Sequence, residues 1–243
     1  MQSALYVSLS AQVSLEKRLE TIANNMANMK TTAFRADAVK FETALSRAAS
    51  QPVAFATPGD NFISRAAGSV TQTGNNLDVA VVGNSWMGFT GPSGPVYTRD
   101  GRMQISSTGE LQTITGYPVL DAGGTPIIVD PDAGPLTISR NGTISQGTNE
   151  VGMLGLFEIA ADAKLARFAN SGVVPDRGAT AVVDFINTGF QQGYVEGSNV
   201  DPLSEMTQLM TATRAFQSVS SLIESSEGTM QNAIRTLGEP SKS

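Results

Sequence analysis

Apolar residues near the N-terminus recur every three or four positions. The first Gly of the chain is Gly59 and the first Pro is Pro52, so no helix-breaking residue interrupts the segment before them. Five apolar residues of this segment fall on one narrow helix face: Leu15, Leu19, Ile22, Met26 and Met29. We expect a helix from residue 4 to about residue 31, with an apolar stripe as narrow as a coiled-coil seam.

The C-terminal segment shows the same spacing over a longer stretch. Its stripe consists of Leu209, Ala212, Phe216, Val219, Ile223, Ser226, Met230, Ala233 and Leu237. Asp201 and Pro202 precede the stripe, and an Asp cap followed by Pro in the first turn is a typical helix start. A helix that is polar over most of its circumference gains little stability alone. The two stripes therefore predict helices that pair with each other or with neighbouring subunits.

Between these helices the pattern changes to short β-branched runs separated by Gly, Asn, Asp and Pro. We expect strands at residues 77–82, 96–98, 103–105, 110–113, 118–120, 127–129, 136–139, 143–145, 154–160 and 181–186. Asn141 and Gly142 separate two of these runs, which favours a type I′ hairpin turn. Residues 36–49 are compatible with a second helix, whereas residues 51–65 contain two Pro and a Gly and are expected to be extended.

Together the patterns predict an α+β protein. Long N- and C-terminal helices would pair as a coiled coil, and a central all-β domain would be joined to them by extended linkers. The helical domain would comprise residues 1–35 and 197–243, the linkers residues 36–67 and 187–196, and the β domain residues 68–186. No apolar run approaches the length of a membrane span.

The composition removes most catalytic chemistry. The 243 residues include neither His nor Cys, so the usual general base near neutral pH, the thiolate nucleophile and the commonest transition-metal ligands are missing. Asp130 and Asp132 are the only close acidic pair in the middle of the chain, and their Pro- and Gly-containing surroundings favour a turn over a metal or acid–base site. We expect no catalytic, metal-binding or cofactor-binding site, and no cofactor.

The net charge of -6 arises mainly from the middle of the chain. Basic residues form no patch along the sequence, so we expect neither phosphate nor nucleic acid as a partner, and no small-molecule substrate. The first basic residue is Lys17, and Ser3, Ser8 and Ser10 interrupt the apolar residues before it, which argues against a cleaved secretory signal peptide.

Three segments carry motifs of a known family. The first, from Leu15 to Phe34, contains Ala23, Asn24, Asn25, Ala27, Asn28, Thr31 and Phe34. The second runs from Thr73 to Gly83, with Tyr97–Gly101 and Gly109–Leu111 downstream, and the third is Glu196–Asp201. Read together, these segments resemble the rod and hook subunits of the bacterial flagellum. Ala33 stands where this family usually has Gly, which removes the residue best suited to a positive φ and favours continuation of the helix.

The resemblance implies a structural, non-enzymatic subunit of the flagellar basal-body rod. Such a subunit would polymerise helically through its terminal helices and form part of the periplasm-spanning shaft and export channel. Its partners would be other rod subunits, copies of itself and the flagellar type III export apparatus. Within the family, the chain most resembles a subunit of the proximal rod, and the alternative is a distal rod or hook-type axial subunit. Outside it, the alternatives are a carboxylate-based enzyme acting on peptidoglycan and an adhesive β-domain with helical stalks.

The expected assembly interface combines the two stripes with polar motif residues. Asn24, Asn25 and Asn28 lie beside the first stripe, where their amides either bond to neighbouring helices and fix the register or remain solvated. The complete expected set is Leu15, Leu19, Ile22, Asn24, Asn25, Met26, Asn28, Met29, Phe34, Ser198, Asn199, Leu209, Phe216, Val219, Ile223, Met230 and Leu237.

Overall fold

The computed structural model describes residues 2–46 and 53–238. The chain divides into two compact units. The first, called the helical unit below, comprises Met1–Ala27, Asp37–Phe62 and Asp201–Ser243. The second, called the β unit, comprises Asn28–Ala36 and Ile63–Val200. The division between a rod-core domain and an outer domain, with the boundaries given above, stays a prediction.

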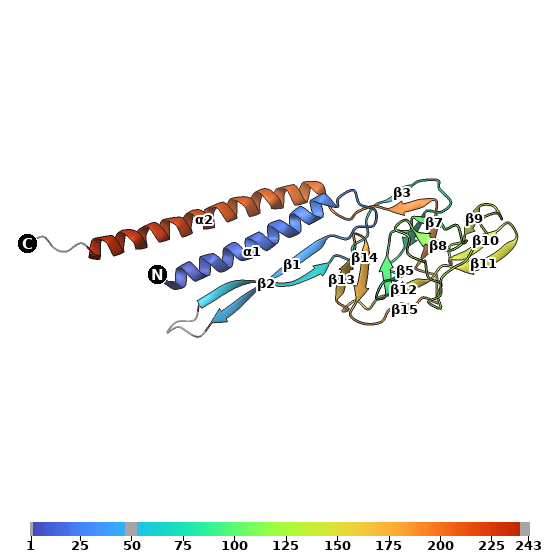
Figure 1. Ribbon diagram of the computed structural model, residues 1–243, viewed down its shortest axis with the longest axis horizontal. Helices are drawn as coiled ribbons and strands as arrows, with labels where there is room; N and C mark the ends of the chain where they lie inside the picture. Colours follow the sequence, from blue (N-terminus) through green and yellow to red (C-terminus); the bar gives the residue numbers. More distant parts are fainter. Residues whose placement is uncertain (1, 47–52, 239–243) are drawn as a thin grey trace, which may run out of the picture. The chain divides into compact units, whose positions relative to one another are not determined.

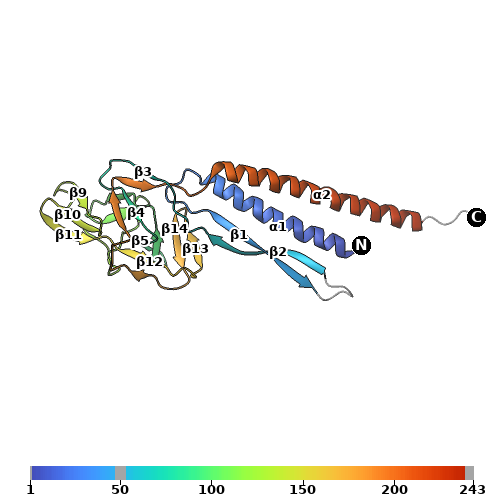
Figure 2. The same cartoon turned by 180° about the vertical axis from the view of Figure 1, so that it is seen from behind.

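The helical unit is built from two long helices and a pair of strands. Helices α1 (Gln2–Ala27) and α2 (Pro202–Gly238) lie side by side and run in opposite directions (Figures 1 and 2). Strands β1 (Asp37–Ser46) and β2 (Val53–Ile63) form a two-stranded sheet, and β1 lies against α1. None of the helices in the described part of the chain is both long and apolar enough to cross a bilayer.

The start of α2 is as expected, whereas α1 ends earlier than expected. The Asp201 carboxylate accepts a hydrogen bond from the backbone N of Leu203 at 3.1 Å, which caps the first turn of α2. Helix α1 ends at Ala27, and a turn follows in which the backbone N of Thr31 donates to the carbonyl of Asn28 at 3.0 Å. Met29 therefore does not extend the apolar stripe of the helix.

The predicted fold class is wrong in its linkers. Most of the segment assigned to the first linker forms β1 and β2, so the helix considered for residues 36–49 is also wrong. Residues of the second expected linker form β16 (Gly189–Gln192) and β17 (Tyr194–Glu196), which pair with β4 (Val79–Val82) and β3 (Val70–Gln72). A coiled coil is not confirmed either, because α1 packs against β1 as well as against α2.

The β unit contains several small sheets in addition to one larger sheet. The larger sheet has the order β13-β14-β6-β5-β12-β15, and a three-stranded sheet has the order β11-β10-β9. Strands β7 and β8 form a separate pair. The bounds of these strands are β5 Trp86–Gly91, β6 Gly94–Thr98, β7 Met103–Ile105, β8 Leu111–Thr113, β9 Leu136–Ile138, β10 Thr143–Gln146, β11 Asn149–Met153, β12 Leu156–Glu158, β13 Leu165–Phe168, β14 Gly172–Pro175 and β15 Thr180–Ala181.

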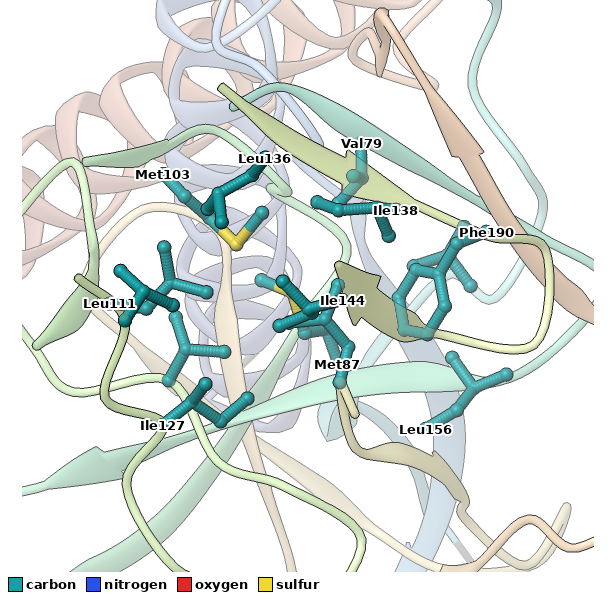
Figure 3. Packing of buried hydrophobic residues seen from close by; sticks show 14 of the residues in the cluster. Val79, Met87, Met103, Leu111, Ile127, Leu136, Ile138, Ile144, Leu156 and Phe190 are labelled. Atoms are coloured by element: carbon teal, nitrogen blue, oxygen red, sulfur yellow. The ribbon is translucent and has the colours of Figure 1, made fainter. Parts of the chain in front are cut away.

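Two apolar clusters lie on opposite faces of β5. Met87 belongs to a cluster with Leu111, Ile144 and Leu156 (Figure 3), whereas its neighbour Trp86 belongs to a second cluster. The second cluster also contains Tyr97, Phe157 and Val173. Successive residues of a strand point to opposite faces. The larger sheet is therefore buried on both sides at β5, which explains the continuous apolar character of this strand.

The loop between β9 and β10 is a hairpin of a different type from the one expected. The backbone N of Gly142 donates to the carbonyl of Ser139, and the N of Ser139 donates to the carbonyl of Thr143. Gly142 has a φ of 89°, whereas Asn141 is not among the residues with positive φ. A three-residue loop with one left-handed Gly needs no second positive φ, so the expected type I′ turn is wrong although the hairpin is present.

Candidate assembly site

A buried carboxylate, Glu196, holds together segments from distant parts of the sequence. Its Oε1 lies 2.6 Å from Nη2 of Arg35 and accepts a 2.8 Å hydrogen bond from the backbone N of Gly68. Its Oε2 accepts a 2.6 Å bond from Nε of Arg99, and its carbonyl accepts a 2.8 Å bond from the N of Ala33. We call these five residues the Glu196 cluster. They fix where the chain enters and leaves the β unit.

Arg99 is fully partnered within this cluster. Besides Glu196, its guanidinium donates 2.7 Å hydrogen bonds to the carbonyls of Val81, Gly83 and Ser85. It therefore satisfies the carbonyls at the end of β4 and in the turn that leads to β5. A charge buried in this way is tolerated because each of the three guanidinium nitrogens has an acceptor.

Arg35 is buried with fewer partners. Its side chain is 2% exposed and that of Glu196 1% exposed, and the guanidinium carbon of Arg35 lies 5.7 Å from the centre of the Trp86 ring. Burial lowers the pKa of Arg35 to about 10; the nearby charge of Arg99 acts in the same direction, whereas Glu196 opposes it. Nε and Nη1 of Arg35 are buried and have no hydrogen-bond partner in the described part of the chain.

Asn199, which follows β17, is joined by hydrogen bonds to residues 34–36 and to Ala66. Its Oδ1 accepts from the backbone N of Ala36 at 2.7 Å, and its Nδ2 donates to the carbonyl of Ala66 at 2.8 Å. Its backbone N donates to the carbonyl of Phe34 at 3.1 Å, and Phe34 itself is buried. Ser198 is half-buried, and its hydroxyl accepts a bond from the N of Val200. Within this chain, Phe34 and Asn199 thus hold two distant segments of the β unit together.

The conformation of Ala33 differs from the expectation. Its φ is 55°, in the left-handed region that favours Gly, and the helix does not continue through it. The hydrogen bond from its N to the Glu196 carbonyl lies within the Glu196 cluster. The cluster therefore helps to hold Ala33 in a backbone conformation that is strained for a residue other than Gly.

In the helical unit, the polar motif residues have different surroundings. Asn25 is buried, and its amide bonds to Asp37 and Glu205. Asn24 is exposed, and its Nδ2 donates to the Asp37 carboxylate at 2.9 Å. Asn28, at the start of the β unit, accepts a bond from the hydroxyl of Thr31 at 3.1 Å.

The predicted apolar stripes lie on the more buried faces of the helices. Ile22 and Ala212 are buried, whereas Met29 is exposed beyond the end of α1. The half-buried members are Leu15, Leu19, Met26, Leu209, Phe216, Val219, Ile223, Ser226 and Met230. The side chains of Ala233 and Leu237 lie outside the described residues. The stripes are thus partly used within the chain, and their role in contacts between subunits stays a prediction.

Each helix also carries a second apolar stripe, which is exposed and which the sequence analysis missed. On α1 this stripe consists of Tyr6, Leu9 and Val13, and on α2 of Leu203, Met206 and Met210. In both triplets the residues are three and four positions apart, and this helical spacing could have identified the stripes from the sequence. At about 100° per residue, each lies about 140° around its helix from the first stripe. We call these six residues the exposed stripes.

No group of three or more acidic residues placed to hold a metal ion occurs among the described residues. Asp130 and Asp132 form the turn that their sequence predicts. The carboxylate of Asp130 accepts a 2.9 Å bond from the backbone N of Asp132. This bond is the usual way in which an Asp side chain stabilises a turn.

The sequence matches three family descriptions in chain order. Residues 5–35 match "Flagella basal body rod protein", residues 80–146 match "Flagellar hook protein FlgE/F/G D1 domain", and residues 191–236 match "Flagellar basal body rod FlgEFG protein C-terminal". Arg35, Arg99 and Glu196 each lie in a different one of these matched segments. The Glu196 cluster is therefore built from all three.

Full-length relatives give the same result. The chain is 44% identical to the flagellar basal-body rod protein FlgF of Mesorhizobium japonicum, over 99% of this chain and 100% of the relative. It is also 44% identical to FlgF of Rhizobium meliloti, over 98% and 99% of the two chains. The chain belongs to the flagellar basal-body rod protein family. The flagellar basal-body rod protein FlgG of Bacillus subtilis is 29% identical over 96% of this chain and 98% of the relative, so the similarity is greater to these FlgF proteins.

Membership of the flagellar basal-body rod protein family confirms several predictions. The chain is a structural subunit of the basal-body rod, and it assembles with other rod and hook components of the flagellum. The prediction that it is not an enzyme is confirmed by the names of these relatives. Sequence reasoning missed Arg35 entirely, and it quoted Arg99 and Glu196 only as parts of motifs.

Proposed function

We propose that this rod subunit polymerises through the two terminal helices of its helical unit, with the exposed stripes as the principal contacts between neighbouring subunits. The contacts would be heterologous, so that they repeat without closing and give helical growth. The residues of the first stripes, from Leu15 to Met26 and from Leu209 to Met230, would contribute their half-exposed parts. The β unit would form the outer layer.

The observation that carries this proposal is the exposure of the second stripe on α2. Met206 is 52% exposed and Met210 is 56% exposed, although both lie on a helix that already buries its other apolar face. Covering the exposed part of each such side chain contributes on the order of 1 kcal/mol. Repeated along a polymer, contacts of this size favour assembly without being needed for the fold of the single chain.

The subunit would occupy the periplasm-spanning part of the rod and line the export channel with its helices. It would reach this position through the flagellar type III export apparatus. Its contacts would be with copies of itself and with other rod subunits, whose names among the relatives describe rod and hook proteins. No small-molecule substrate forms part of this function.

The experiment places charges in the exposed stripe. Met206→Asp combined with Met210→Asp would put two carboxylates into a subunit contact, where an unpaired charge costs more than the lost packing. The variant would replace the wild-type gene in a motile strain, and swimming in soft agar would be measured. We expect loss of swimming, no incorporation into isolated basal bodies, and an unchanged melting curve of the purified subunit.

Thr207→Asp combined with Thr211→Asp is the matched control. Both Thr residues are exposed on the same turns of α2 but outside the stripe. This control adds the same charge and should retain swimming. Normal swimming of the Met variant, or an equal loss in the Thr variant, would show that the stripe is not an assembly contact.

A further inference from the structure

A cavity of about 200 Å³ in the β unit is lined by three arginines. Arg35, Arg65 and Arg99 lie around it, together with Asn84, Trp86 and Ala161. In the sequence these basic residues are far apart, which is why no basic patch was recognised. The fold brings them together beside the Glu196 cluster.

The positive charges around this cavity exceed the negative charges. Arg35 and Arg99 share the single carboxylate of Glu196. Arg65 donates to two neutral acceptors, the carbonyls of Ile159 and Ala163, each at 2.9 Å. The nearby carboxylate of Asp162 is exposed and paired with Arg177 at 2.7 Å. Three guanidinium groups are therefore balanced by one buried carboxylate.

Arg35 contributes most to this excess of positive charge. Its side chain is nine-tenths buried or more, it lines the cavity, and its Nε and Nη1 have no acceptor in the described part of the chain. A buried guanidinium with unused donors is costly, and a charged acceptor compensates it better than a neutral one. Water could accept these hydrogen bonds, but it would leave the excess charge uncompensated.

We propose that this cavity binds a small oxyanion, of the class of inorganic phosphate, sulfate or a carboxylate, which the guanidinium groups of Arg35, Arg65 and Arg99 attract by their charge. The volume is several times the roughly 30 Å³ that one water occupies in the liquid, so it accommodates such an anion. Trp86 forms one wall, against the guanidinium of Arg35. This site is independent of the assembly contacts and goes beyond the structural function proposed above.

The cavity contains its own reporter, because Trp86 is the single Trp of the chain. The purified full-length subunit would be titrated with inorganic phosphate, sulfate and acetate, with sodium chloride added to keep the ionic strength constant. We expect a saturable change in Trp fluorescence and a parallel rise in melting temperature, since a ligand that binds only the folded state stabilises it. Saturation by phosphate and sulfate identifies a tetrahedral oxyanion, and saturation by acetate identifies a carboxylate.

Ala161 offers a matched pair of variants that leaves the Glu196 cluster intact. Ala161→Glu brings a carboxylate of the chain itself to the cavity, whereas Ala161→Gln has the same size without the charge. We expect Ala161→Glu to melt at a higher temperature than Ala161→Gln and to bind the anion at least about tenfold more weakly. The Gln variant should still respond to the anion.

Two results would overturn the proposal. One is the absence of a saturable response to all three anions at constant ionic strength. The other is an identical response of the Ala161→Glu and Ala161→Gln variants, which would remove the assignment to this cavity. Neither result depends on rod assembly, so failure of the anion proposal would not contradict the proposed assembly contacts. Likewise, the swimming assay tests those contacts and not this site.

Discussion

The side-chain amide of Asn25 on α1 donates a 3.2 Å hydrogen bond to Oε1 of Glu205 in the first turn of α2. The same amide donates to the carbonyl of Asp37 at 2.9 Å, and its Oδ1 accepts from the N of Asp37 at 2.8 Å. One buried Asn thus joins the end of α1, the start of β1 and the start of α2. A buried amide of this kind fixes the register of neighbouring helices, which explains why an Asn occupies this position beside an apolar stripe.

Glu205 gives the helical unit a pH-dependent stability. The residue is 9% exposed, and burial raises the pKa of its carboxyl, with a smaller effect of Asp201 in the same direction. The hydrogen bond from Asn25 and the charge of Arg18 act against this shift. A carboxyl whose pKa is raised by folding stabilises the fold below its unfolded value of about 4.5, and this contribution is lost as the pH rises through the folded value. We therefore predict that Glu205→Gln raises the melting temperature of the helical signal at neutral pH.

The advantage of Glu205→Gln should disappear near pH 4, where the native carboxyl is protonated and resembles the amide. Circular dichroism melts at a series of pH values would measure the difference. Glu224→Gln, at an exposed position of the same helix, is the control and should show no such trend. A constant difference across the whole pH range would show that Glu205 does not titrate with folding.

The helices were predictable because local patterns determine them. The stripe from Leu209 to Met230, the cap at Asp201 and the Pro at 202 specify α2 without information from the rest of the chain. The hairpin at Gly142 was predictable for a similar reason. Its turn type was not, because the choice between loop lengths depends on how β9 and β10 are paired.

The segment before β2 shows what the sequence pattern could have indicated. Val39, Phe41 and Leu45 are separated by two and four positions, so they would share one face of a strand, whereas the absence of Gly and Pro favoured a helix. The pairing with β2 decides the outcome, and pairing between strands is not a local property. The Glu196 cluster was unpredictable for the same reason, since its members are far apart in the sequence and meet only in the folded β unit.

The Glu196 cluster should dominate the stability of the β unit. Removing one charge from a buried ion pair costs about 3–5 kcal/mol, because the remaining guanidinium groups stay buried without compensation. We predict that Glu196→Gln lowers the free energy of unfolding by about this amount. Chemical denaturation followed by Trp86 fluorescence would measure it.

Asp162 provides the matched comparison for Glu196. Its contact with Arg177 is also short, at 2.7 Å, but both side chains are more than half exposed. Exposed pairs are screened by solvent and contribute little to stability, so Asp162→Asn should have little effect on the free energy of unfolding. If both variants lost the same stability, burial of the Glu196 cluster would not be the cause.

Ala33 should tolerate only small side chains. A β-branched residue at a φ of 55° is strained, and Ala33 is fully buried, so Ala33→Val should cost about 2–4 kcal/mol through strain and overpacking. Ala33→Gly relieves the backbone strain, but it also removes a buried methyl group and gives the unfolded chain more conformational freedom. These effects oppose one another, so the free energy of unfolding of this variant should stay within about 1 kcal/mol of that of the native protein. Urea denaturation of the two variants, with Ala166→Val in β13 as the control, would test this. Equal stabilities of Ala33→Val and the control variant would contradict it.

The β unit should fold without the helices, provided that both of its chain passages are present. Residues 28–36 supply Phe34 and Arg35, and residues 189–200 supply β16, β17 and Glu196, all of which are needed to complete its sheets and its buried ion pairs. The carbonyl of Ala36 accepts a 2.8 Å hydrogen bond from the N of Ser64, so the two sides of the β1–β2 insertion lie close together. A short Gly-Ser linker can therefore replace residues 37–62 in a fragment that runs from residue 28 to residue 200.

We predict that this fragment melts cooperatively, within about 5 °C of the β-unit transition of the full chain. A shorter fragment of residues 68–190 contains most of the β strands but leaves Arg99 buried without its carboxylate and β4 without half of β16. It should melt broadly or not at all, and it should bind a hydrophobic dye. Calorimetry of both fragments measures the difference. If the shorter fragment melted as cooperatively and at the same temperature, the Glu196 cluster and the two chain passages would be additions to an independently stable β core rather than part of it.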